Sequence, residues 1–262
     1  MSDAQTLATS PEDTKAYWEQ KAERKGHDPN FTLPDYHLRG LEAEYIARHL
    51  RPTDRAIDIG CGNGATTVRY AERVEHIIGA DFSEPSIRKA RELHPAANVA
   101  YRVMDIMNLD AADAEFDVVI TERCLINLPD WPAQQQAIRE VVRVLKPGGR
   151  YLMCESFEEA FTRFADLRTH FGLEPMARHW HNRLIRETEV RPYLERFFCV
   201  DAIEKMGLYY LISRLVHPLL VAPQDPKFDA DINRIAVRLT TGMSPDALAD
   251  ISVNGLYVLT KR

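Results

Sequence analysis

The segment Ala56-Ile-Asp-Ile-Gly-Cys-Gly-Asn-Gly64 decides the fold that we expect for this chain. An apolar run over Arg55–Ile59 predicts a buried strand, and the glycines that follow it predict a tight turn. The helix-period segment Ala65–Val74 comes next, so amide groups at a helix start would face a ligand bound beside the glycines. A strand, a glycine turn and a helix in this order are typical of the first unit of a parallel sheet.

Short apolar runs continue to alternate with helix-period segments further along the chain. We expect strands at His76–Ala80, Asn98–Met104, Phe116–Thr121 and Arg150–Cys154. We expect helices at Glu84–Leu93, capped by Ser83, and at Pro132–Leu145. The alternation predicts an α/β fold with a doubly wound parallel sheet and helices on both of its faces.

Less regular regions flank this core. We expect a helical cap at residues 1–50, with helices near Lys15–Glu23 and Leu41–Leu50, and a lid or substrate insertion at 157–197. Residues 51–156 and 198–262 would form one core domain, interrupted by a helical excursion near 207–250. Within that excursion, Leu208–Val221 is either a core-packed helix or part of an acceptor pocket, and a helix is expected around Asp229–Leu239. The last strands are expected at Val200–Met206 and Ile251–Leu259.

Charge and composition narrow the class of protein. Lysine and arginine total 33 against 39 for aspartate and glutamate, which gives a net charge of −6. No basic run is present, so we expect no nucleic-acid partner. The first 20 residues lack an apolar run, no stretch approaches a membrane span, and the four cysteines form no C-x-x-C pair. We therefore expect a cytoplasmic protein without a membrane partner.

Polar residues end four successive expected strands, where open parallel sheets bind their ligands. Asp81 lies 21 positions beyond Gly60, at a point where a carboxylate can accept hydrogen bonds from two ribose hydroxyls. Asp105, at the end of the third strand, could accept from the exocyclic amine of adenine, although helix capping or turn formation would explain it as well. The series predicts a ligand that contains a nucleoside.

Two nucleoside cofactors could use such a site. A nicotinamide dinucleotide carries a pyrophosphate and wants a G-x-G-x-x-G or G-x-G-x-x-A turn, which Gly60, Gly62 and Ala65 formally provide. S-adenosylmethionine carries an ammonium, a carboxylate and a sulfonium. Asp58 favours S-adenosylmethionine, because its carboxylate would repel a pyrophosphate and attract an ammonium.

These motifs together resemble the class I S-adenosylmethionine-dependent methyltransferases. The resemblance is carried by Ala56–Gly64, Asp81, Asp105-Ile106, Phe116-Asp-Val-Val119 and Leu145-Lys-Pro-Gly-Gly149. It implies a Rossmann-like, seven-stranded sheet whose seventh strand is antiparallel. It also implies that Gly60 and Gly62 contact the methionine part, Asp81 the ribose, Asp105 with Ile106 the adenine, and Thr121 with Glu122 the inner wall. The long segment 207–250 departs from the family pattern, in which a tight connection is usual.

The expected cofactor site includes one residue chosen on its own chemistry. Arg39 is expected to pair with the cofactor carboxylate, because a guanidinium binds a carboxylate through paired hydrogen bonds. The full expected set is Arg39, Asp58, Gly60, Cys61, Gly62, Asp81, Phe82, Asp105, Ile106, Thr121 and Glu122. The cofactor would be S-adenosyl-L-methionine and the product S-adenosyl-L-homocysteine.

Acceptor and catalytic residues depend on the group that is methylated. A base is needed only for a hydroxyl or a protonated amine, and His181 is the candidate. His179 and His181 without a nearby carboxylate or cysteine make a thin ligand set, so no metal is expected. The expected acceptor-binding residues are Tyr17, His37, Arg123, Asn127, His179, Trp180, Arg183, Tyr209 and Tyr210.

The sequence thus predicts an enzyme that transfers a methyl group in-line to a small molecule. The target is oxygen or nitrogen, and the several arginines and histidines favour an anionic or sugar-like acceptor. Two alternatives stay open at this point: an NAD-dependent oxidoreductase with the same sheet, and a binding module that holds S-adenosylmethionine without catalysis. The sequence does not fix the oligomeric state.

Overall fold

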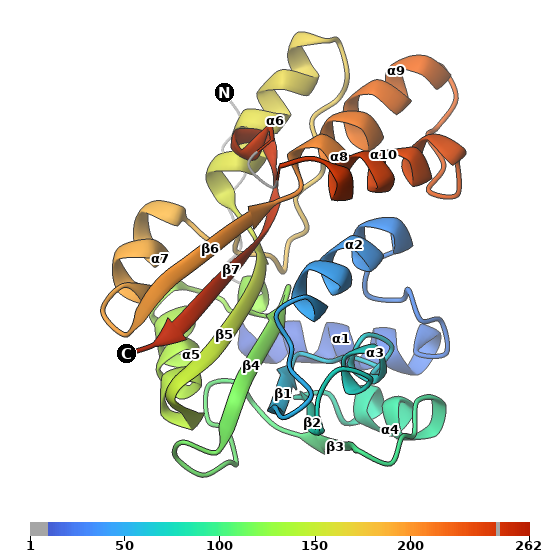
Figure 1. Cartoon of the computed structure of the whole chain (residues 1–262). Helices are drawn as coiled ribbons and strands as arrows, with labels where there is room; N and C mark the ends of the chain where they lie inside the picture. Colours follow the sequence, from blue (N-terminus) through green and yellow to red (C-terminus); the bar gives the residue numbers. More distant parts are fainter. Residues whose placement is uncertain (1–9, 245–246) are drawn as a thin grey trace.

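The computed structural model describes residues 10–244 and 247–262 and contains one seven-stranded mixed sheet (Figure 1). Its strands lie in the order β3-β2-β1-β4-β5-β7-β6, and β7 is antiparallel to both of its neighbours. The expected Rossmann-like α/β fold with an antiparallel seventh strand is therefore confirmed. The strands are β1 (Arg55–Ile59), β2 (His76–Asp81), β3 (Val99–Val103), β4 (Phe116–Glu122), β5 (Leu145–Ser156), β6 (Phe198–Lys205) and β7 (Asn254–Lys261).

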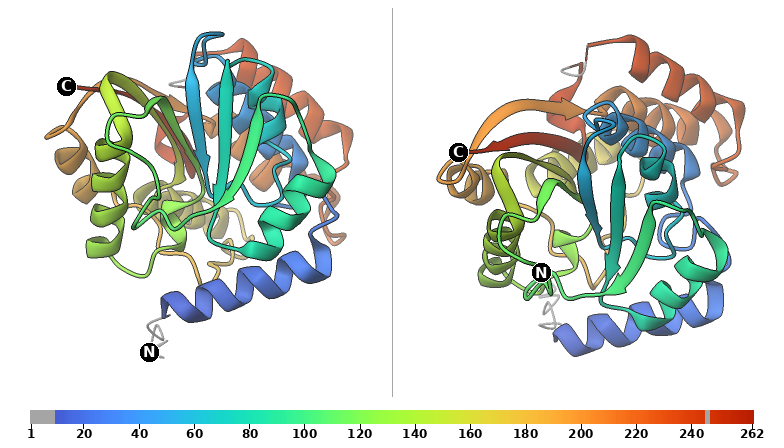
Figure 2. Two further views of the ribbon diagram at one scale, coloured as in Figure 1. Left: turned by 90° about the horizontal axis from the view of Figure 1, so that it is seen from below. Right: turned by 60° about the horizontal axis from the view of Figure 1, so that its bottom comes forward.

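Helices cover both faces of the sheet and extend beyond one end of it (Figures 1 and 2). They are α1 (Pro11–Lys25), α2 (Tyr36–Ala47), α3 (Thr67–Ala71), α4 (Glu84–Leu93), α5 (Trp131–Val144), α6 (Glu158–His170), α7 (Glu187–Leu194), α8 (Gly207–Leu211), α9 (His217–Val221) and α10 (Asp231–Gly242). A π-helical turn over Ile212–Val216 joins α8 to α9. None of the helices in the described ranges combines the length and the apolar character that a bilayer span requires.

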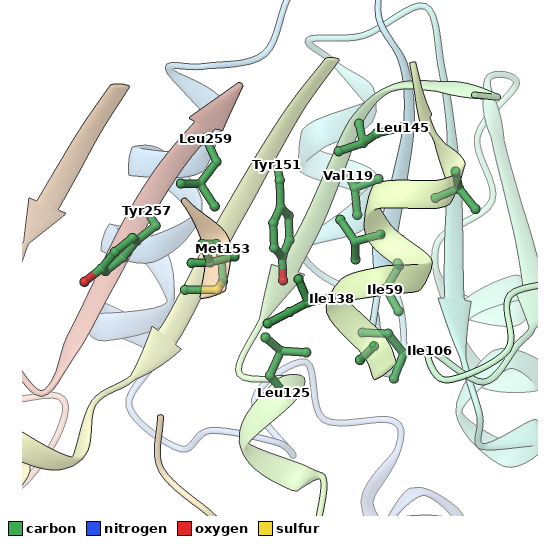
Figure 3. Close-up of a cluster of buried hydrophobic side chains, with 14 of the residues drawn as sticks. Ile59, Ile106, Val119, Leu125, Ile138, Leu145, Tyr151, Met153, Tyr257 and Leu259 are labelled. Carbon is green, nitrogen blue, oxygen red and sulfur yellow. The ribbon is translucent and has the colours of Figure 1, made fainter. Parts of the chain in front are cut away.

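Alternating side chains of the strands build two hydrophobic layers, because neighbouring residues of a strand point to opposite faces. Val119 of β4 packs on the side of α5, together with Tyr151 and Met153 of β5 and Ile138 of the helix (Figure 3). The next residues of each strand belong to the other layer, which packs against α2, α8 and α10. Both faces are buried, as the continuous apolar runs of the sequence predict.

Two helices have limits that differ from the expected ones. The helix expected at Leu41–Leu50 is α2, which starts at Tyr36 because the Asp35 carboxylate accepts a hydrogen bond from the Leu38 amide at 3.0 Å. The helix expected at Ala65–Val74 is reduced to α3, after a longer glycine turn. Helix α4 has the predicted limits, and the Ser83 hydroxyl caps it.

The two insertions occupy different places. Within residues 157–197, α7 packs Val190 and Leu194 into the layer beside α5, so this helix covers the sheet. The connecting loop 171–186 instead reaches the carboxyl ends of the strands. The excursion between β6 and β7 forms α8, α9 and α10, and of these α10 packs against α2 (Figure 1). The limits of the cap and of the lid as separate units stay predictions, and residues 1–9 of the expected cap lie outside the described residues.

Candidate active site

A cavity of about 430 Å³ lies at the carboxyl ends of β1, β2 and β4. The turn after β1 and the acidic residues that end β2 and β4 form one wall. Helix α1, the segment that leads into α2, and loop 171–186 form the other. This is the point where the order of the sheet reverses between β1 and β4, which is the usual ligand site of such sheets.

The glycine turn after β1 brings backbone close to the cavity. Gly60 has a φ of 82°, which glycine adopts without strain, and its amide donates to the Ala80 carbonyl at 2.7 Å. A Cβ at Gly60 would lie 2.9 Å from the side chain of Cys124. Gly62 also has a positive φ, and its amide donates to Asp81 Oδ2 at 2.9 Å. The turn and the end of β2 are therefore locked together at the cavity wall.

Two carboxylates supply the negative charge of this wall. Asp81 accepts the Gly62 and Ser83 amides, each at 2.9 Å, and loss of hydration raises its pKa to about 6. Asp58 is buried and accepts the Thr67 hydroxyl at 2.6 Å. Burial raises the pKa of Asp58 to about 7. A cationic or hydroxyl-bearing ligand would stabilise the ionised form of both groups.

Arg39 is placed as the sequence analysis expects, at the cavity and buried in α2. Its guanidinium donates to the Pro29 carbonyl and to the Thr32 hydroxyl, the latter at 2.6 Å. Its Nε atom has no partner among the described residues. Burial, followed by the positive charge of Arg123, lowers the pKa of Arg39. A ligand carboxylate would satisfy this atom and restore the charge balance.

Arg123 sits between two acidic side chains at the end of β4. It donates to Glu42 and, at 2.8 Å, to Glu122, and Tyr70 donates to the second oxygen of Glu122 at 3.0 Å. Arg123 has a φ of 52°, an uncommon conformation for a residue with a side chain. These two acidic partners occupy donors of the Arg123 guanidinium, so few remain for an acceptor molecule. Its contacts instead support the cavity wall, and the predicted contact with the acceptor stays a prediction.

Aromatic and imidazole rings form the opposite wall. His181 stacks on Tyr17 with ring centroids 4.6 Å apart, and on His179 with ring centroids 5.5 Å apart. Trp18 donates from its indole to Asn127 Oδ1 at 3.0 Å, which ties α1 to the loop after β4. Burial, followed by the charges of His179 and Lys21, lowers the pKa of His181 to about 4. The Nδ1 atom of His181 has no partner in the described part of the chain.

The cavity brings together most of the expected site residues. Those that line it are Tyr17, Arg39, Asp58, Gly60, Cys61, Gly62, Asp81, Phe82, Glu122, Arg123, Asn127, His179 and His181. Their convergence from α1, α2, three strands and loop 171–186 is a property of the fold.

The other expected residues lie outside this cavity, for separate physical reasons. Asp105 is exposed and accepts the Met107 amide at 2.9 Å, which is the turn-forming alternative, and Ile106 packs in the core. Thr121 is buried and shares a hydrogen bond with the Tyr151 hydroxyl at 2.9 Å. His37 is half-buried and its ring contacts Tyr36.

Four expected acceptor residues are also placed elsewhere. Arg183 pairs with Glu189 at 2.9 Å, and Tyr210 donates to Asn254 at 2.9 Å. Tyr209 is fully buried and donates to both oxygens of Asp35 at 2.8 Å. Its position agrees with the first alternative for Leu208–Val221, a helix packed in the core. Trp180 is 53% exposed and meets Tyr17 and His181 in T-shaped ring contacts.

Several residues at the cavity were not predicted from the sequence. They include Lys21, Phe31, Asp35, Asn63, Cys124 and Phe228. Asp35 carried a usable signal, because an aspartate three residues before Leu38 can cap a helix. Asn63 lies within the glycine turn that the sequence analysis singled out, although no role was predicted for its side chain. The remaining four come from segments far apart in the chain.

The geometry defines a class of protein. A glycine turn, carboxylates at the ends of β1 and β2, and an arginine with an unsatisfied donor fit a ligand that has a ribose, an ammonium and a carboxylate. These are the groups of S-adenosylmethionine, and the fold is that of the class I methyltransferases that use it.

Comparisons with known proteins agree. A family model described as "Methyltransferase domain" matches residues 56–149. The ubiquinone biosynthesis O-methyltransferase of Hahella chejuensis is 30% identical over 206 residues, covering 74% of this chain and 79% of that protein. The 27-O-demethylrifamycin SV methyltransferase of Amycolatopsis mediterranei is 40% identical over 106 residues, which is 38% of each protein.

A solved S-adenosylmethionine-dependent methyltransferase from Methanosarcina mazei has the same fold, with a TM-score of 0.54 and 19% identity over 83% of this chain and 96% of that one. The chain belongs to the S-adenosylmethionine-dependent methyltransferase family, and S-adenosylmethionine is the cofactor of that family. The oxidoreductase alternative is therefore wrong. The chain spans from 38% to 55% of the length of several relatives that it matches.

Proposed function

We propose that this protein transfers a methyl group from S-adenosylmethionine to a hydroxyl group of a small-molecule acceptor. The observation that carries the proposal is a single cavity in which the cofactor-type wall, with Asp81 and Arg39, faces the wall formed by Tyr17 and His181. S-adenosylmethionine, when bound, supplies an electrophilic methyl group on a sulfonium. The chain must then hold an acceptor oxygen in line with that group and remove its proton.

On the cofactor wall, each group would meet a partner of matching charge. Asp81 would accept hydrogen bonds from the two ribose hydroxyls, and the Nε atom of Arg39 would donate to the carboxylate. Asp58 would stabilise the ammonium, directly or through water. Burial has removed water from the carboxylates of Asp58 and Asp81 and so raises the pKa of both. The bound cofactor would replace the lost water and stabilise their ionised forms.

On the acceptor wall, His181 would act as the base. Its low pKa keeps the imidazole neutral at pH 7, so the unpartnered Nδ1 atom can accept a hydrogen bond from the acceptor hydroxyl. The hydroxyl proton would move to Nδ1 as the oxygen is methylated. An imidazolium with so low a pKa would then release the proton to water. Tyr17, stacked on His181, would hold the ring in place.

The small-molecule part of the proposal is supported by the cavity and by the relatives. Helix α1 and loop 171–186 enclose the site, which leaves room for a compact acceptor. Two relatives bear names of methyltransferases that act on oxygen. The acidic net charge argues against nucleic acid as a partner. All four cysteines are free, which supports the cytoplasm as the place of action.

The test is a transfer experiment with methyl-labelled S-adenosylmethionine and a metabolite extract, followed by mass analysis of labelled products. We expect a labelled methyl ether with the native protein and none with Asp81→Ala. The His181→Ala variant should bind S-adenosylhomocysteine normally and form the product slowly. Cofactor binding without any labelled product would contradict the proposal and favour the alternative of a binding module without catalysis.

A further inference from the structure

A second cavity of about 430 Å³ lies beside the first, in the excursion between β6 and β7. The π-helical turn, α9 and the connection to α10 form most of its wall, and the chain that follows α6 closes it. Arg214 and Phe228 line both cavities, with the guanidinium 5.1 Å from the ring centroid. Arg214 and Phe228 thus belong to the linings of both cavities, which places the two cavities next to each other.

Asn233 lines this cavity and has a side-chain oxygen that accepts no hydrogen bond from a described residue. The side chain is 1% exposed, and its Nδ2 atom donates to the Lys227 carbonyl at 2.9 Å and the Phe228 carbonyl at 3.0 Å. These two bonds fix which end of the amide is nitrogen. The oxygen, Oδ1, is left with no partner among the described residues. A buried amide oxygen without a donor costs free energy that a ligand donor would recover.

His217 adds a second unsatisfied atom. It is 4% exposed, and its Nδ1 has no partner in the described ranges. Arg168, also at this cavity, donates to two backbone carbonyls, of Glu174 at 2.8 Å and of Arg214, and makes no ion pair with a described residue. The wall therefore offers donors as well as the acceptor on Asn233.

The mixture of groups selects the chemistry of the occupant. The wall carries basic residues (Arg168, Arg214 and Lys227) and acidic ones (Glu174 and Asp225), so charge alone does not select the ligand. A simple anion could bind Arg168 but has no hydrogen to donate, so it would leave the oxygen of Asn233 unsatisfied. An apolar chain would satisfy neither polar atom. A hydroxyl both donates and accepts, so a group with several hydroxyls can satisfy Asn233 and His217 together.

The wall also has apolar parts that suit a ring with hydroxyl groups. Leu173, Met176 and Pro218 line the cavity between the polar residues. The C–H faces of a sugar ring can pack on such side chains while its hydroxyls reach the polar atoms.

We propose that this second cavity binds a hydroxyl-rich, glycosyl-like part of the acceptor while another hydroxyl of the same molecule is methylated in the first cavity. The inference rests on the proposed function and names a class of acceptor for it. Arg214 and Phe228 would then lie along the acceptor, between its glycosyl-like part and the methylated group.

The test uses methyl β-D-glucopyranoside as the probe. It is titrated into the full-length, nitrogen-15-labelled protein with S-adenosylhomocysteine present, and the Asn233 side-chain amide signal is followed. We expect a saturable shift, and the His217→Phe variant should weaken binding about fivefold or more because it loses one hydrogen bond. His170→Phe, on the exposed end of α6 and outside both cavities, is the matched control and should bind as the native protein does.

Two results would overturn the inference: no saturable shift with the glucoside, or a shift with inorganic phosphate and none with the glucoside. Calorimetry of S-adenosylhomocysteine on the same samples separates this inference from the proposed function. Normal binding of that compound, with the glucoside inert, removes the second site alone. Glucoside binding that His217→Phe weakens, in a protein that methylates nothing, keeps the second site and removes the proposed reaction.

Discussion

The two walls of the cavity are built in different ways. The wall with Asp58, Gly62 and Asp81 is formed within the first strands of the sheet and the turns between them. The wall with Tyr17 and His181 is assembled from helix α1 and loop 171–186, which are far apart in the chain. The first is held by short-range backbone geometry, and the second by contacts between side chains.

This difference separates cofactor binding, which depends on the sheet, from acceptor choice, which depends on contacts between side chains. Turn conformation and hydrogen bonds such as the one from the Gly62 amide to Asp81 tolerate little change, because each strand end has to stay in register. The acceptor wall depends on pairs such as Trp18 with Asn127, 109 residues apart, and Tyr17 with His181. Such pairs can be exchanged without altering the sheet, so we expect acceptor choice to vary while cofactor binding stays.

The largest effect should come from the cofactor wall. Replacing Asp81 by alanine removes a charged acceptor for two ribose hydroxyls, and affinity for S-adenosylhomocysteine should fall roughly a thousandfold. Calorimetry measures the loss. Asp105→Ala is the control, because that carboxylate is exposed and outside the cavity, and it should change affinity less than about threefold. Equal losses of affinity for the two variants would contradict the placement of Asp81 at the cofactor site and of Asp105 outside it.

A second test concerns the backbone of the same wall. Gly60→Ala places a Cβ 2.9 Å from Cys124 at a φ of 82°, and should lower the free energy of unfolding by about 3 kcal/mol. Gly40→Ala, in α2 with open space around it, should raise that free energy by about 0.5–1 kcal/mol. Denaturant unfolding followed by circular dichroism compares them. A harmless Gly60→Ala variant would contradict the account of the turn.

On the acceptor wall, the loss should appear in turnover and not in cofactor binding. His181→Ala should reduce kcat about a hundredfold, since a positioned base contributes about that much at the low end. The affinity for S-adenosylhomocysteine should stay within about twofold of the native value. His170→Ala, which removes an exposed ring on α6 outside the cavity, is the matched control and should leave kcat unchanged. An unchanged kcat for His181→Ala would exclude it as the base.

The pH dependence of binding follows from the raised pKa of Asp81, about 6. Lowering the pH from 8 to 5 protonates this carboxyl, so cofactor affinity should fall about tenfold by calorimetry. The stability of the free protein has the opposite sign. Because the folded pKa is above the ordinary 3.8, the contribution of this group is full below pH 3.8 and is lost as the pH rises through about 6. Binding that strengthens toward pH 5 would contradict this.

The smallest effect is expected where α1 meets the loop after β4. Trp18→Phe keeps a ring and removes the indole donor to Asn127, so the acceptor KM should rise about threefold to tenfold. Steady-state kinetics measure this change, and kcat should be nearly constant. Trp131→Phe, at the start of α5 and outside the cavity lining, serves as the control and should leave KM unchanged. A Trp18→Phe variant with native KM would show that α1 does not shape the acceptor site.

The same contrast explains what the sequence could predict. The strands, α4 and its Ser83 cap follow from periodicity and turn chemistry, which act over a few residues. Asp58, Asp81 and the glycine turn were identified because they lie at or directly after the ends of β1 and β2, at a known spacing. The contact of Asp105 with the adenine stays a prediction, because the same aspartate chemistry that binds a ligand also forms a turn, and Asp105 accepts the Met107 amide in such a turn.

The acceptor side was predicted only in part, because its residues meet through tertiary packing. His181 and Tyr17 could be selected as chemically able side chains, but nothing local shows that their rings stack. Tyr209 was expected at the acceptor and is instead buried against Asp35, a partner that no spacing rule connects to it. The unpaired atoms of Asn233 and His217 are likewise visible only once the chain is folded.

A crystal structure with bound S-adenosylhomocysteine tests the central claim most directly. We expect the ribose hydroxyls within hydrogen-bond distance of Asp81, the carboxylate against Arg39, and the sulfur turned toward the rings of Tyr17 and His181. A ligand bound elsewhere, or one whose sulfur faces away from those rings, would contradict the view that cofactor and acceptor meet in this cavity.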